Sequence, residues 1–448
     1  MAVTHVLARL QREPLGDDCA LARQVDQLCR AQAHRWRDRI LTPLVTVRLM
    51  LLQVLHGNTA IKHLRQLSGL DFAAGSFCEA RERLPLLLLQ ELLQWVACLA
   101  DGARSVLIGP RVLIADCSSF SMSDTPALRT HFGRVKARGA KAGVSYPVAK
   151  LVGLMDAATG MFVQLLAAPL YTHDLRYTPD VHPMLRPGDI LLGDRAYCSF
   201  GHFALLQLRG VFGCFRLHQR RKPGPGGVQR WKRGPKAPAW LTAGQWLALP
   251  QWLDVRIVSY HVSEPGFRTR QVTIATTLFD CVAWPDAKIA ELYGHRWRVE
   301  TCFDHLKTTM KMNVLKCQSV DGVMKELATY LLVYNLVRLA MLHAAERQKQ
   351  SVWRISFVDA VRWLCARMLG LAGVERLVTN PLRPGRCQPR VIRRRMKEYD
   401  LMNKPREAYE TPRKSDQNEL TEWHSDPSHF RPVPFPPSLG PSRPTAPI

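Results

Sequence analysis

Three carboxylates occur where sheet strands and a helix could bring them together. Asp116 follows the apolar run VLIA and Asp194 follows ILLG, whereas Glu300 lies in a segment of helical periodicity. Acids at the carboxyl ends of strands project into the crevice where open α/β sheets hold their ligands. The two aspartates could therefore face a ligand bound in that crevice.

Each aspartate on its own has a simpler explanation. An Asp after a strand commonly caps a turn, and for Asp116 or Asp194 alone that role is the more frequent one. Other aspartates lie in turn-like contexts and fit the capping role better: Asp124, Asp156, Asp174 and Asp189.

The segment ELYGHRWRVETCFDHLKTTM carries the third acid among regularly spaced polar residues. These are Tyr293, Arg296, Glu300 and Lys307, at offsets of 0, 3, 7 and 14. At about 100° per residue, all of them emerge within a sector of about 60° on one helix. A solvated face with ion pairs is the alternative, but only Arg296 and Glu300 are spaced for such a pair.

This spacing, Y-x2-R-x3-E-x6-K, resembles the signature of the insertion sequence 4 family of bacterial transposases. The segments IADCSSF and GDRAY match the places where that family has its first and second catalytic aspartates. The blocks LTPLVTVRLMLLQVL and QPRVIRRRMKEY also look like family segments. The resemblance covers nearly everything except the extreme carboxy-terminal tail.

The resemblance implies an α/β (α+β) fold with a ribonuclease H-like mixed sheet and a strand-rich insertion. It implies cut-and-paste DNA transposition, by phosphodiester hydrolysis and strand transfer at terminal inverted repeats. Asp116, Asp194 and Glu300 would be the catalytic residues and the ligands of two Mg²⁺ or Mn²⁺ ions, with Asp116 bridging them. Because both water and a DNA 3′-hydroxyl are oxygen nucleophiles, no covalent protein–DNA intermediate is required.

The resemblance also implies DNA contacts around these acids. Tyr293 would contact DNA, while Arg296 and Lys307 would bind phosphates beside the scissile bond. Relatives cut the second strand through a hairpin, which requires a base to leave the stack. An aromatic side chain of the insertion could hold that base, although each candidate is more often a packing residue. The candidates are Trp231, Trp240, Trp246 and Trp252.

Two basic regions are expected to follow the DNA backbone. The first lies in the insertion and includes Arg220, Arg221, Lys222, Arg230, Lys232 and Arg233, with Trp231 among them. The second lies near the carboxyl end and includes Arg390, Arg393, Arg394, Arg395 and Lys397. A solvated tail is the alternative for such charge runs.

Composition agrees with a nucleic-acid partner. The 448 residues contain 62 Lys and Arg against 37 Asp and Glu, giving a net charge of +25. Such a surplus draws a protein to polyanions, of which duplex DNA is the strongest common one. The 12 cysteines include no CxxC pair, which disfavours a zinc site or a secreted disulfide scaffold. With no signal peptide or membrane span recognised, a cytoplasmic, nucleoid-associated bacterial protein is expected.

Patterning divides the chain into four regions. Residues 1–105 form a helical DNA-binding domain, or alternatively an ordinary helical bundle. Within it, Thr42-Pro43 predicts a helix start, and Ser76 with Glu79 fits a capping box. Residues 106–345 form the catalytic domain with an insertion at about 219–275. Residues 346–410 form a basic helical region, and 411–448 a disordered tail.

Three functional hypotheses differ in what they explain. An active transposase accounts for the three acids, the helical start and the Tyr-Arg-Glu-Lys set. A catalytically silent DNA-binding derivative, or inhibitor of transposition, would be expected to lack an acid. A ribonuclease H-like nuclease that cuts without joining shares the acids but leaves the helical start unexplained. Pairing two DNA ends would require at least a homodimer, for which helices after Ser351 are the candidate surface.

Overall fold

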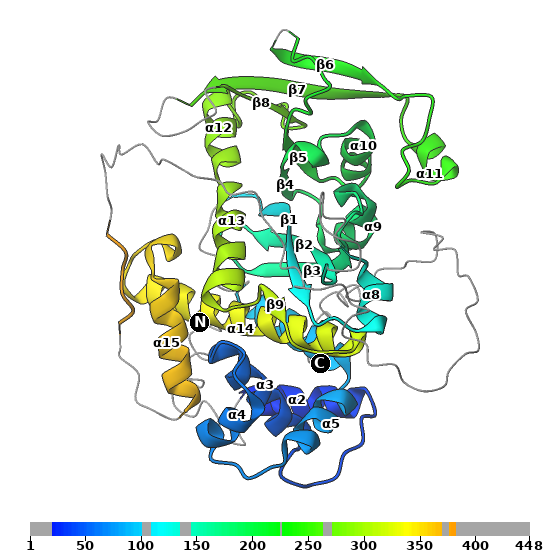
Figure 1. Ribbon diagram of the computed structural model, residues 1–448. Coiled ribbons are helices and arrows are strands. Elements are labelled where there is room, and N and C mark those ends of the chain that lie inside the picture. The colour runs from blue at the N-terminus through cyan, green and yellow to red at the C-terminus, as the bar shows by residue number, and fades with distance from the viewer. Residues whose placement is uncertain are drawn as a thin grey trace, which may run out of the picture.

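The computed structural model describes residues 20–100, 109–134, 145–224, 226–262, 271–369 and 376–381. Within these ranges the centre of the protein is a nine-stranded sheet in the order β3-β2-β1-β4-β5-β8-β7-β6, with β9 also paired to β1 (Figure 1). The strands are β1 (Val112–Met122), β2 (Val148–Asp156), β3 (Phe162–Pro169), β4 (Ile190–Gly193), β5 (Phe212–Arg216), β6 (Gly227–Lys232), β7 (Trp252–His261), β8 (Gln271–Thr276) and β9 (Val314–Leu315).

The first five strands form the ribonuclease H-like mixed sheet that the resemblance implies. β2 runs antiparallel to both β1 and β3, whereas β4 runs parallel to β1 and β5 runs parallel to β4. The β2–β3 hairpin turns at residues 156–160, where the Gly160 N–H donates to the Asp156 carbonyl at 2.8 Å. Their apolar sequences, buried on both faces, are typical of strands covered by other elements on each side.

Three further strands extend the same sheet beyond β5. β8 pairs antiparallel to β5, β7 to β8 and β6 to β7, so the stretch predicted as an insertion continues the hydrogen-bonded ladder. β6 forms inside the basic Gly- and Pro-rich segment and is largely exposed at the sheet edge. An edge strand with basic residues resists pairing with other chains.

Helices precede, connect and follow the strands. They are α2 (Ala20–Ala31), α3 (Pro43–Leu55), α4 (Ile61–Ser68), α5 (Ala74–Arg83), α6 (Leu86–Leu99), α8 (Pro126–Phe132), α9 (Thr178–Val181), α10 (Phe200–Leu208), α11 (Ala243–Ala248), α12 (Asp286–Gly294), α13 (Trp297–Asp304), α14 (Val320–Arg347) and α15 (Phe357–Met368). Short turns of other helical types are η1 (Asp174–Tyr177), η2 (His182–Met184), η3 (Arg195–Tyr197), η4 (His305–Thr309) and η5 (Val352–Arg354).

The amino-terminal helices agree with one predicted start and contradict another. The Thr42 hydroxyl accepts a hydrogen bond from the Val45 N–H, and Pro43 occupies the first turn of α3, as predicted. The capping box at Ser76 is wrong, because α5 already begins at Ala74 and has no side-chain cap. Ser76 therefore lies inside the first turn of the helix.

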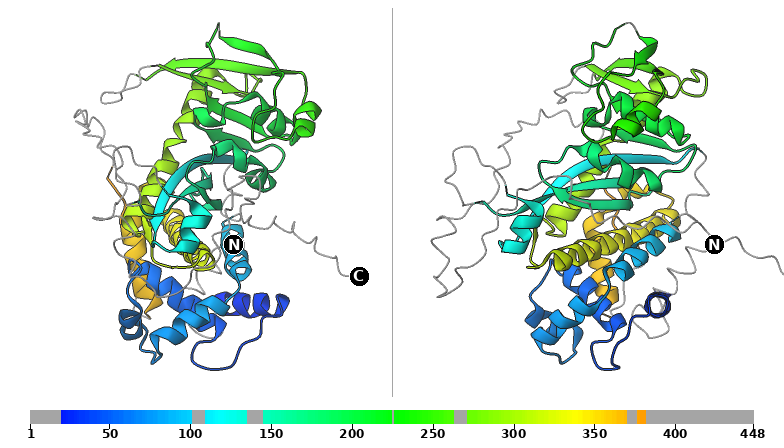
Figure 2. Two further views of the ribbon diagram at one scale, coloured as in Figure 1. Left: turned by 45° about the vertical axis from the view of Figure 1, so that its right-hand side comes forward. Right: turned by 90° about the vertical axis from the view of Figure 1, so that its right-hand side faces the viewer.

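The helix α14 lies between the sheet and the amino-terminal helices, as the views in Figures 1 and 2 both show. It is the one helix in the described residues long and apolar enough to cross a membrane, but 89% of its most apolar window is buried inside the protein. Burial all round identifies it as a core helix.

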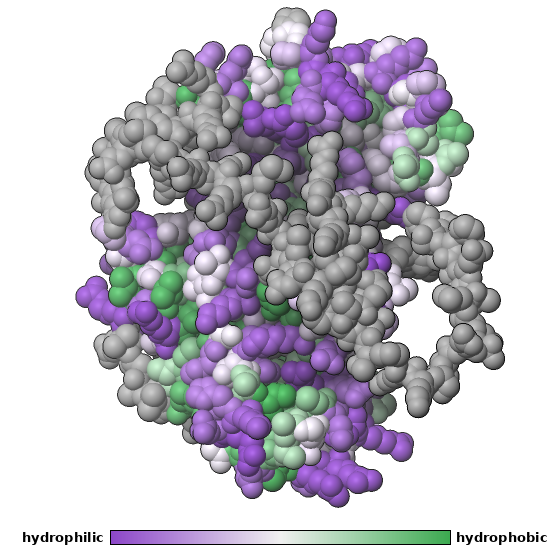
Figure 3. Space-filling model, viewed as in Figure 1, coloured by the Kyte–Doolittle hydropathy of each residue, from purple (hydrophilic) through white to green (hydrophobic). Residues whose placement is uncertain are grey.

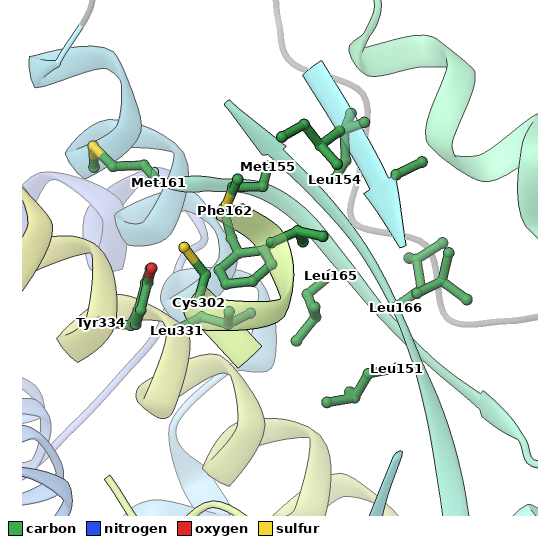
Figure 4. Close-up of a cluster of buried hydrophobic side chains, with 14 of the residues drawn as sticks. Leu151, Leu154, Met155, Met161, Phe162, Leu165, Leu166, Cys302, Leu331 and Tyr334 are labelled. Atoms are coloured by element: carbon green, nitrogen blue, oxygen red, sulfur yellow. The ribbon is translucent and has the colours of Figure 1, made fainter. Parts of the chain in front are cut away.

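Side chains of α14 hold the β2–β3 hairpin through its backbone. The Asn335 amide bonds both the N–H and the C=O of Phe162, at 3.1 and 2.9 Å. The Tyr334 hydroxyl donates to the Gly160 carbonyl at 3.1 Å. Around these bonds lies the apolar cluster of Figure 4, in which Phe162 packs beside Tyr334 and Cys302. Buried polar groups that are fully paired favour one packing arrangement over others.

The other side of α14 is bonded to the amino-terminal helices. Lys325 donates from Nζ to the Glu82 carbonyl at 2.7 Å. The buried Glu326 carboxylate accepts from the Asn58 amide at 2.6 Å and from the Lys316 and Cys317 N–H groups. The segment between η4 and α14 is thereby fixed to the amino-terminal helices.

A glycine in β2 sets how closely α13 approaches the sheet. Gly153 is paired with Asp116 of β1, so both residues face the same side of the sheet. A Cβ on Gly153 would lie 2.9 Å from ring atoms of both Phe162 and Phe303, the latter from α13. The absence of a side chain therefore lets α13 lie directly over Asp116.

We expect Gly153→Ala to destabilise the protein by about 1–3 kcal/mol, because the added methyl overpacks two aromatic rings. Urea unfolding would measure the change. The matched control is Gly244→Ala in α11, where nothing lies within 4 Å of the new Cβ. It should gain up to about 1 kcal/mol from helix propensity. Equal stability of the two variants would contradict the close approach of α13.

Candidate active site

The first two carboxylates leave adjacent parallel strands at the same level. β1 and β4 pair in register, and their last pair is Ala115 with Gly193. The next residue on each strand is the aspartate, so Asp116 and Asp194 lie side by side. Two acids from strands far apart in the sequence are thus brought together by the sheet itself.

The prediction that a strand ends at Asp116 is wrong. β1 continues to Met122, because it keeps pairing with β2 on one side and meets β9 on the other. Asp194, in contrast, does follow its strand. Its Oδ1 accepts the Ala196 N–H at 2.8 Å and caps η3. A carboxylate has a second oxygen, so capping does not exhaust its ligand capacity.

The third carboxylate comes from α13 and is linked to the first through an arginine. Arg296 donates from Nη1 to Asp116 Oδ2 at 3.3 Å and from Nη2 to Glu300 Oε1 at 3.0 Å. The Arg296 side chain is 9% exposed, whereas that of Glu300 is 49% exposed. A buried guanidinium needs such partners, because an unpaired buried charge is strongly unfavourable.

The pKa of Asp116 reflects the presence of the other two acids nearby. Burial raises the pKa of Asp116 to about 6, and the neighbouring Asp194 and Glu300 carboxylates add to the rise. The Arg296 guanidinium and the Cys117 N–H act on this pKa in the opposite direction. Asp116 is therefore a carboxylate whose charged form needs a nearby cation.

These residues fit a divalent cation by their chemistry. Asp116, Asp194 and Glu300 offer hard oxygen ligands at one place, and Asp116 would gain from additional positive charge. Within the described ranges, no three Asp, Glu, His or Cys side chains are already drawn together as a metal-binding group. The positive charge between two of the acids is the Arg296 guanidinium.

The helix predicted to carry all four polar residues is interrupted twice. A turn at residues 295–296 separates α12 from α13, and η4 is a π-helical turn. The rotation of about 100° per residue in a continuous α-helix therefore does not describe how these four side chains are arranged. Tyr293 is buried at the end of α12, with 4% exposure, and burial raises its pKa.

Lys307 lies in the π-helical turn and reaches back to the sheet. Its Nζ donates to Ser118 Oγ at 3.3 Å, two residues beyond Asp116 on β1. Single π-turns inserted in α-helices are frequent at functional sites. Here the turn brings the lysine beside the strand that carries the first carboxylate.

The predicted contacts of the insertion differ in exposure. Arg220 is exposed, and Arg230 is exposed with a long ion pair of 3.6 Å to Asp254. Arg221 lies with its guanidinium 3.7 Å from the centre of the Trp231 ring, and that tryptophan is buried. Packing thus describes Trp231 better than a free stacking surface does. Figure 3 shows hydrophilic residues gathered over this end of the molecule.

Of the tryptophans considered for base stacking, Trp252 is the exposed one, at 45%. Arg230 and Lys232 lie over its ring, at 5.9 and 5.5 Å from the centre. Trp246 is buried, and Trp240 packs against the core. The basic residues Arg393, Arg394 and Arg395 lie outside the described residues.

The sequence analysis missed an aromatic residue at the site itself. Trp297 is 50% exposed, and the Arg296 guanidinium lies 4.4 Å from its ring centre. It precedes Glu300 by three residues, which places the two on the same face of α13. The HRWRVE segment contains the signal, an aromatic residue three positions before Glu300, whereas the resemblance pointed only to aromatics of the insertion.

A buried histidine pair supports the turn that follows Asp194. His202 Nδ1 bonds the Tyr197 carbonyl at 2.8 Å, and its Nε2 lies 3.1 Å from Nε2 of His182. The Tyr197 hydroxyl in turn lies 3.5 Å from the Cys117 thiol beside Asp116. Burial lowers the pKa of His202 to about 4 and that of His182 well below its usual range. Both imidazoles are therefore neutral in the folded protein at neutral pH.

The chain is similar to known transposases. A family model described as a transposase DDE domain matches residues 108–336, a span that contains all three carboxylates. Transposase InsG for insertion sequence element IS4, from Escherichia coli strain K12, is 23% identical over 314 residues, covering 65% of this chain and 69% of the relative. A piggyBac transposase synaptic complex with hairpin DNA aligns with a TM-score of 0.41 and 10% identity, over 82% of this chain and 80% of that one.

We expect the contribution of His202 to stability to fall as the pH falls from 6.5 towards 4, whereas the raised pKa of Asp116 acts in the opposite sense over this range. Above pH 6.5 His202 is unprotonated in both the folded and the unfolded protein. Between pH 6.5 and 4 the unfolded chain takes up a proton on this histidine, whereas the folded protein does not. The lowered pKa corresponds to about 3 kcal/mol. Urea unfolding across the pH range would measure it. His202→Gln should flatten the dependence, whereas His63→Gln, at an exposed position of α4, should leave it unchanged. An unchanged slope for His202→Gln would contradict this assignment.

Proposed function

This chain belongs to the DDE transposase family, in its insertion sequence 4 branch, and from that premise we propose a cut-and-paste reaction. The enzyme hydrolyses phosphodiester bonds at the terminal inverted repeats of its element and joins the freed ends to target DNA. One observation carries the proposal. Asp116 and Asp194 each follow the last in-register pair of two adjacent strands, Ala115 with Gly193, and one guanidinium links Asp116 to Glu300.

Asp116, Asp194 and Glu300 would hold the divalent ions that this family uses, with Mg²⁺ or Mn²⁺ as the candidates. Two such ions, when bound, activate the attacking oxygen and stabilise the leaving oxygen during in-line displacement. Asp116 would be the central ligand, because its carboxylate lies near both of the others. Asp194 and Glu300 flank it from β4 and α13.

Side chains of the interrupted helix bind and orient the DNA. Lys307, now bonded to a serine hydroxyl, is within reach of a phosphate that lies against β1. Trp297 and Trp252 offer exposed rings on which an unstacked base can rest, an interaction worth roughly 1–3 kcal/mol. Arg296 becomes available to a phosphate once its carboxylates have another cation.

The remaining regions supply DNA-binding surface. We assign residues 1–105 to end recognition, 106–345 to catalysis with the insertion at about 219–275, and 346–410 to further backbone contact, with 411–448 as a tail. Arg393, Arg394 and Arg395 belong to the third of these regions. Joining two ends requires a homodimer in the DNA complex, and bacterial DNA as substrate places the enzyme in the cytoplasm.

The proposal is tested with a linear DNA that carries the repeats flanking the gene. In Mg²⁺ the wild type should cut at the repeat ends and form joined products. EDTA should abolish both reactions. Glu300→Ala should lower cleavage by at least about a thousandfold, because a ligand of the reacting centre is lost. Gel analysis of the products measures both steps.

The matched control is Glu291→Ala, which removes an exposed carboxylate of α12 and should retain full activity. Salt-sensitive binding to the repeat ends without any cleavage would point instead to a silent DNA-binding derivative. Cuts without joined products would point to a nuclease. Either outcome overturns the cut-and-paste assignment.

A second prediction concerns Arg296 and needs no DNA cleavage. Because its guanidinium neutralises Asp116 and Glu300, it competes with a metal ion for the same two carboxylates. Arg296→Gln should therefore bind Mn²⁺ several-fold more tightly than the wild type when DNA is absent. The same variant should be less stable in EDTA, because the acids then repel one another. Calorimetric titration measures the affinity, and thermal unfolding measures the stability.

Arg298→Gln is the control for this substitution. Arg298 lies two residues further along, and its guanidinium donates to the Ala157 carbonyl at 3.0 Å rather than to a carboxylate. It should leave Mn²⁺ affinity at the wild-type level. Weaker or equal Mn²⁺ binding by Arg296→Gln would show that the arginine does not compete with metal.

A further inference from the structure

Positively charged and imidazole side chains gather where β4 and β5 end. Arg195 directly follows Asp194, His218 and Arg220 follow β5, and His173 follows β3. We call these four residues the strand-end cluster. A hydrogen bond from Arg195 to Gln219 places Arg195 beside the loop that carries His218 and Arg220, and the charges of Arg195, Arg220 and His173 all act on His218. Only Arg220 among them was expected from the sequence to contact DNA.

The loop after β5 is fixed to the turn that carries Asp194. Arg195 donates from Nη1 to Gln219 Oε1 at 2.9 Å, and the backbone of His218 bonds the Cys198 thiol. Arg221 stacks on the buried Trp231 at 3.7 Å and so ties the same loop to β6. The strand-end cluster is therefore held in place by the turn that follows β4 and by the insertion.

Local hydrogen bonds determine which nitrogen of each imidazole carries a proton. His173 Nδ1 accepts the Leu175 N–H at 3.3 Å, and His218 Nδ1 accepts the Arg220 N–H at 3.2 Å. A neutral imidazole whose Nδ1 accepts must carry its proton on Nε2. Each histidine thus keeps a donor at its outer nitrogen whether or not it is charged.

The cluster has an excess of donors and of positive charge. In the part of the chain that the structure describes, neither Arg195 nor Arg220 has a carboxylate partner, whereas the nearby Asp174 is paired with Lys150. Burial and then the neighbouring cationic groups lower the pKa of His218, which favours its neutral form. Two guanidinium groups and two N–H donors together are suited to phosphate oxygens.

We propose that His173, Arg195, His218 and Arg220 bind successive phosphates of one DNA strand beside Asp194, on the side facing the insertion. This inference rests on the proposed function, since it places the strand that the active site cuts. The arginines supply charge and bidentate bonds, and the imidazoles supply hydrogen bonds from Nε2. The cluster therefore positions the backbone without reading its sequence.

Fluorescence anisotropy with a repeat-end duplex in EDTA tests the cluster over a salt series. Arg195→Ala should weaken binding about tenfold and reduce the slope of log affinity against log salt by about one, because one phosphate contact is lost. His218→Phe should weaken binding with the slope unchanged, because a neutral donor displaces no counterion. His218→Gln should restore much of the affinity, since it keeps an N–H donor.

Arg186→Ala is the charge-matched control and should bind like the wild type, because this exposed arginine precedes β4 at the end of the strand opposite Asp194. If Arg195→Ala and His218→Phe both keep the wild-type affinity and salt slope, the inference that the cluster binds phosphates is wrong. The proposed function still stands in that case if the wild type cuts this DNA in Mg²⁺. A wild type that neither prefers nor cuts the repeat ends would overturn both. Thermal unfolding of each variant separates a lost contact from a lost fold.

Discussion

A buried guanidinium and two carboxylates from distant parts of the chain meet over the centre of the sheet. Arg296 precedes α13 as its N-cap residue and Glu300 belongs to α13, whereas Asp116 belongs to β1, so the pairing holds only when helix and sheet are correctly placed. An arginine this deeply buried is unfavourable without its partners. Gly153 makes room for the approach, and Phe303 fills that room from the helix side. The active site and the packing of α13 therefore depend on one another.

The scaffold around this pairing is built so that few of its parts can move independently. α14 bonds the β2–β3 hairpin on one side and the amino-terminal helices on the other. Glu326 adds the segment that follows Lys307 to the same framework. The insertion is joined through β8 to β5 by backbone hydrogen bonds rather than by a flexible linker. The insertion is thereby held in a defined relation to β4 and Asp194.

Local patterns in the sequence were sufficient for the strands, the hairpin and the start of α3, because each depends on neighbouring residues. The apolar runs before Asp116 and Asp194 located both acids, and the resemblance supplied their pairing with Glu300. The sequence pattern could not predict features that depend on contacts between residues far apart in the chain. The length of β1 depends on β2 and β9, and the burial of Tyr293 depends on a turn at 295–296. The direction of the Arg296 side chain and the strand-end cluster arise only when residues far apart in the chain meet.

The parallel pairing of β1 with β9 affects how this protein is made. Ser121 is bonded to Asn313, 192 residues further along, so the central strand stays incomplete until most of the chain has been synthesised. Contacts of such sequence separation fold slowly and leave apolar surface exposed meanwhile. A product truncated before β9 and α14 would leave the hairpin without its core helix. Premature termination should therefore yield aggregated or degraded chains rather than stable, folded fragments.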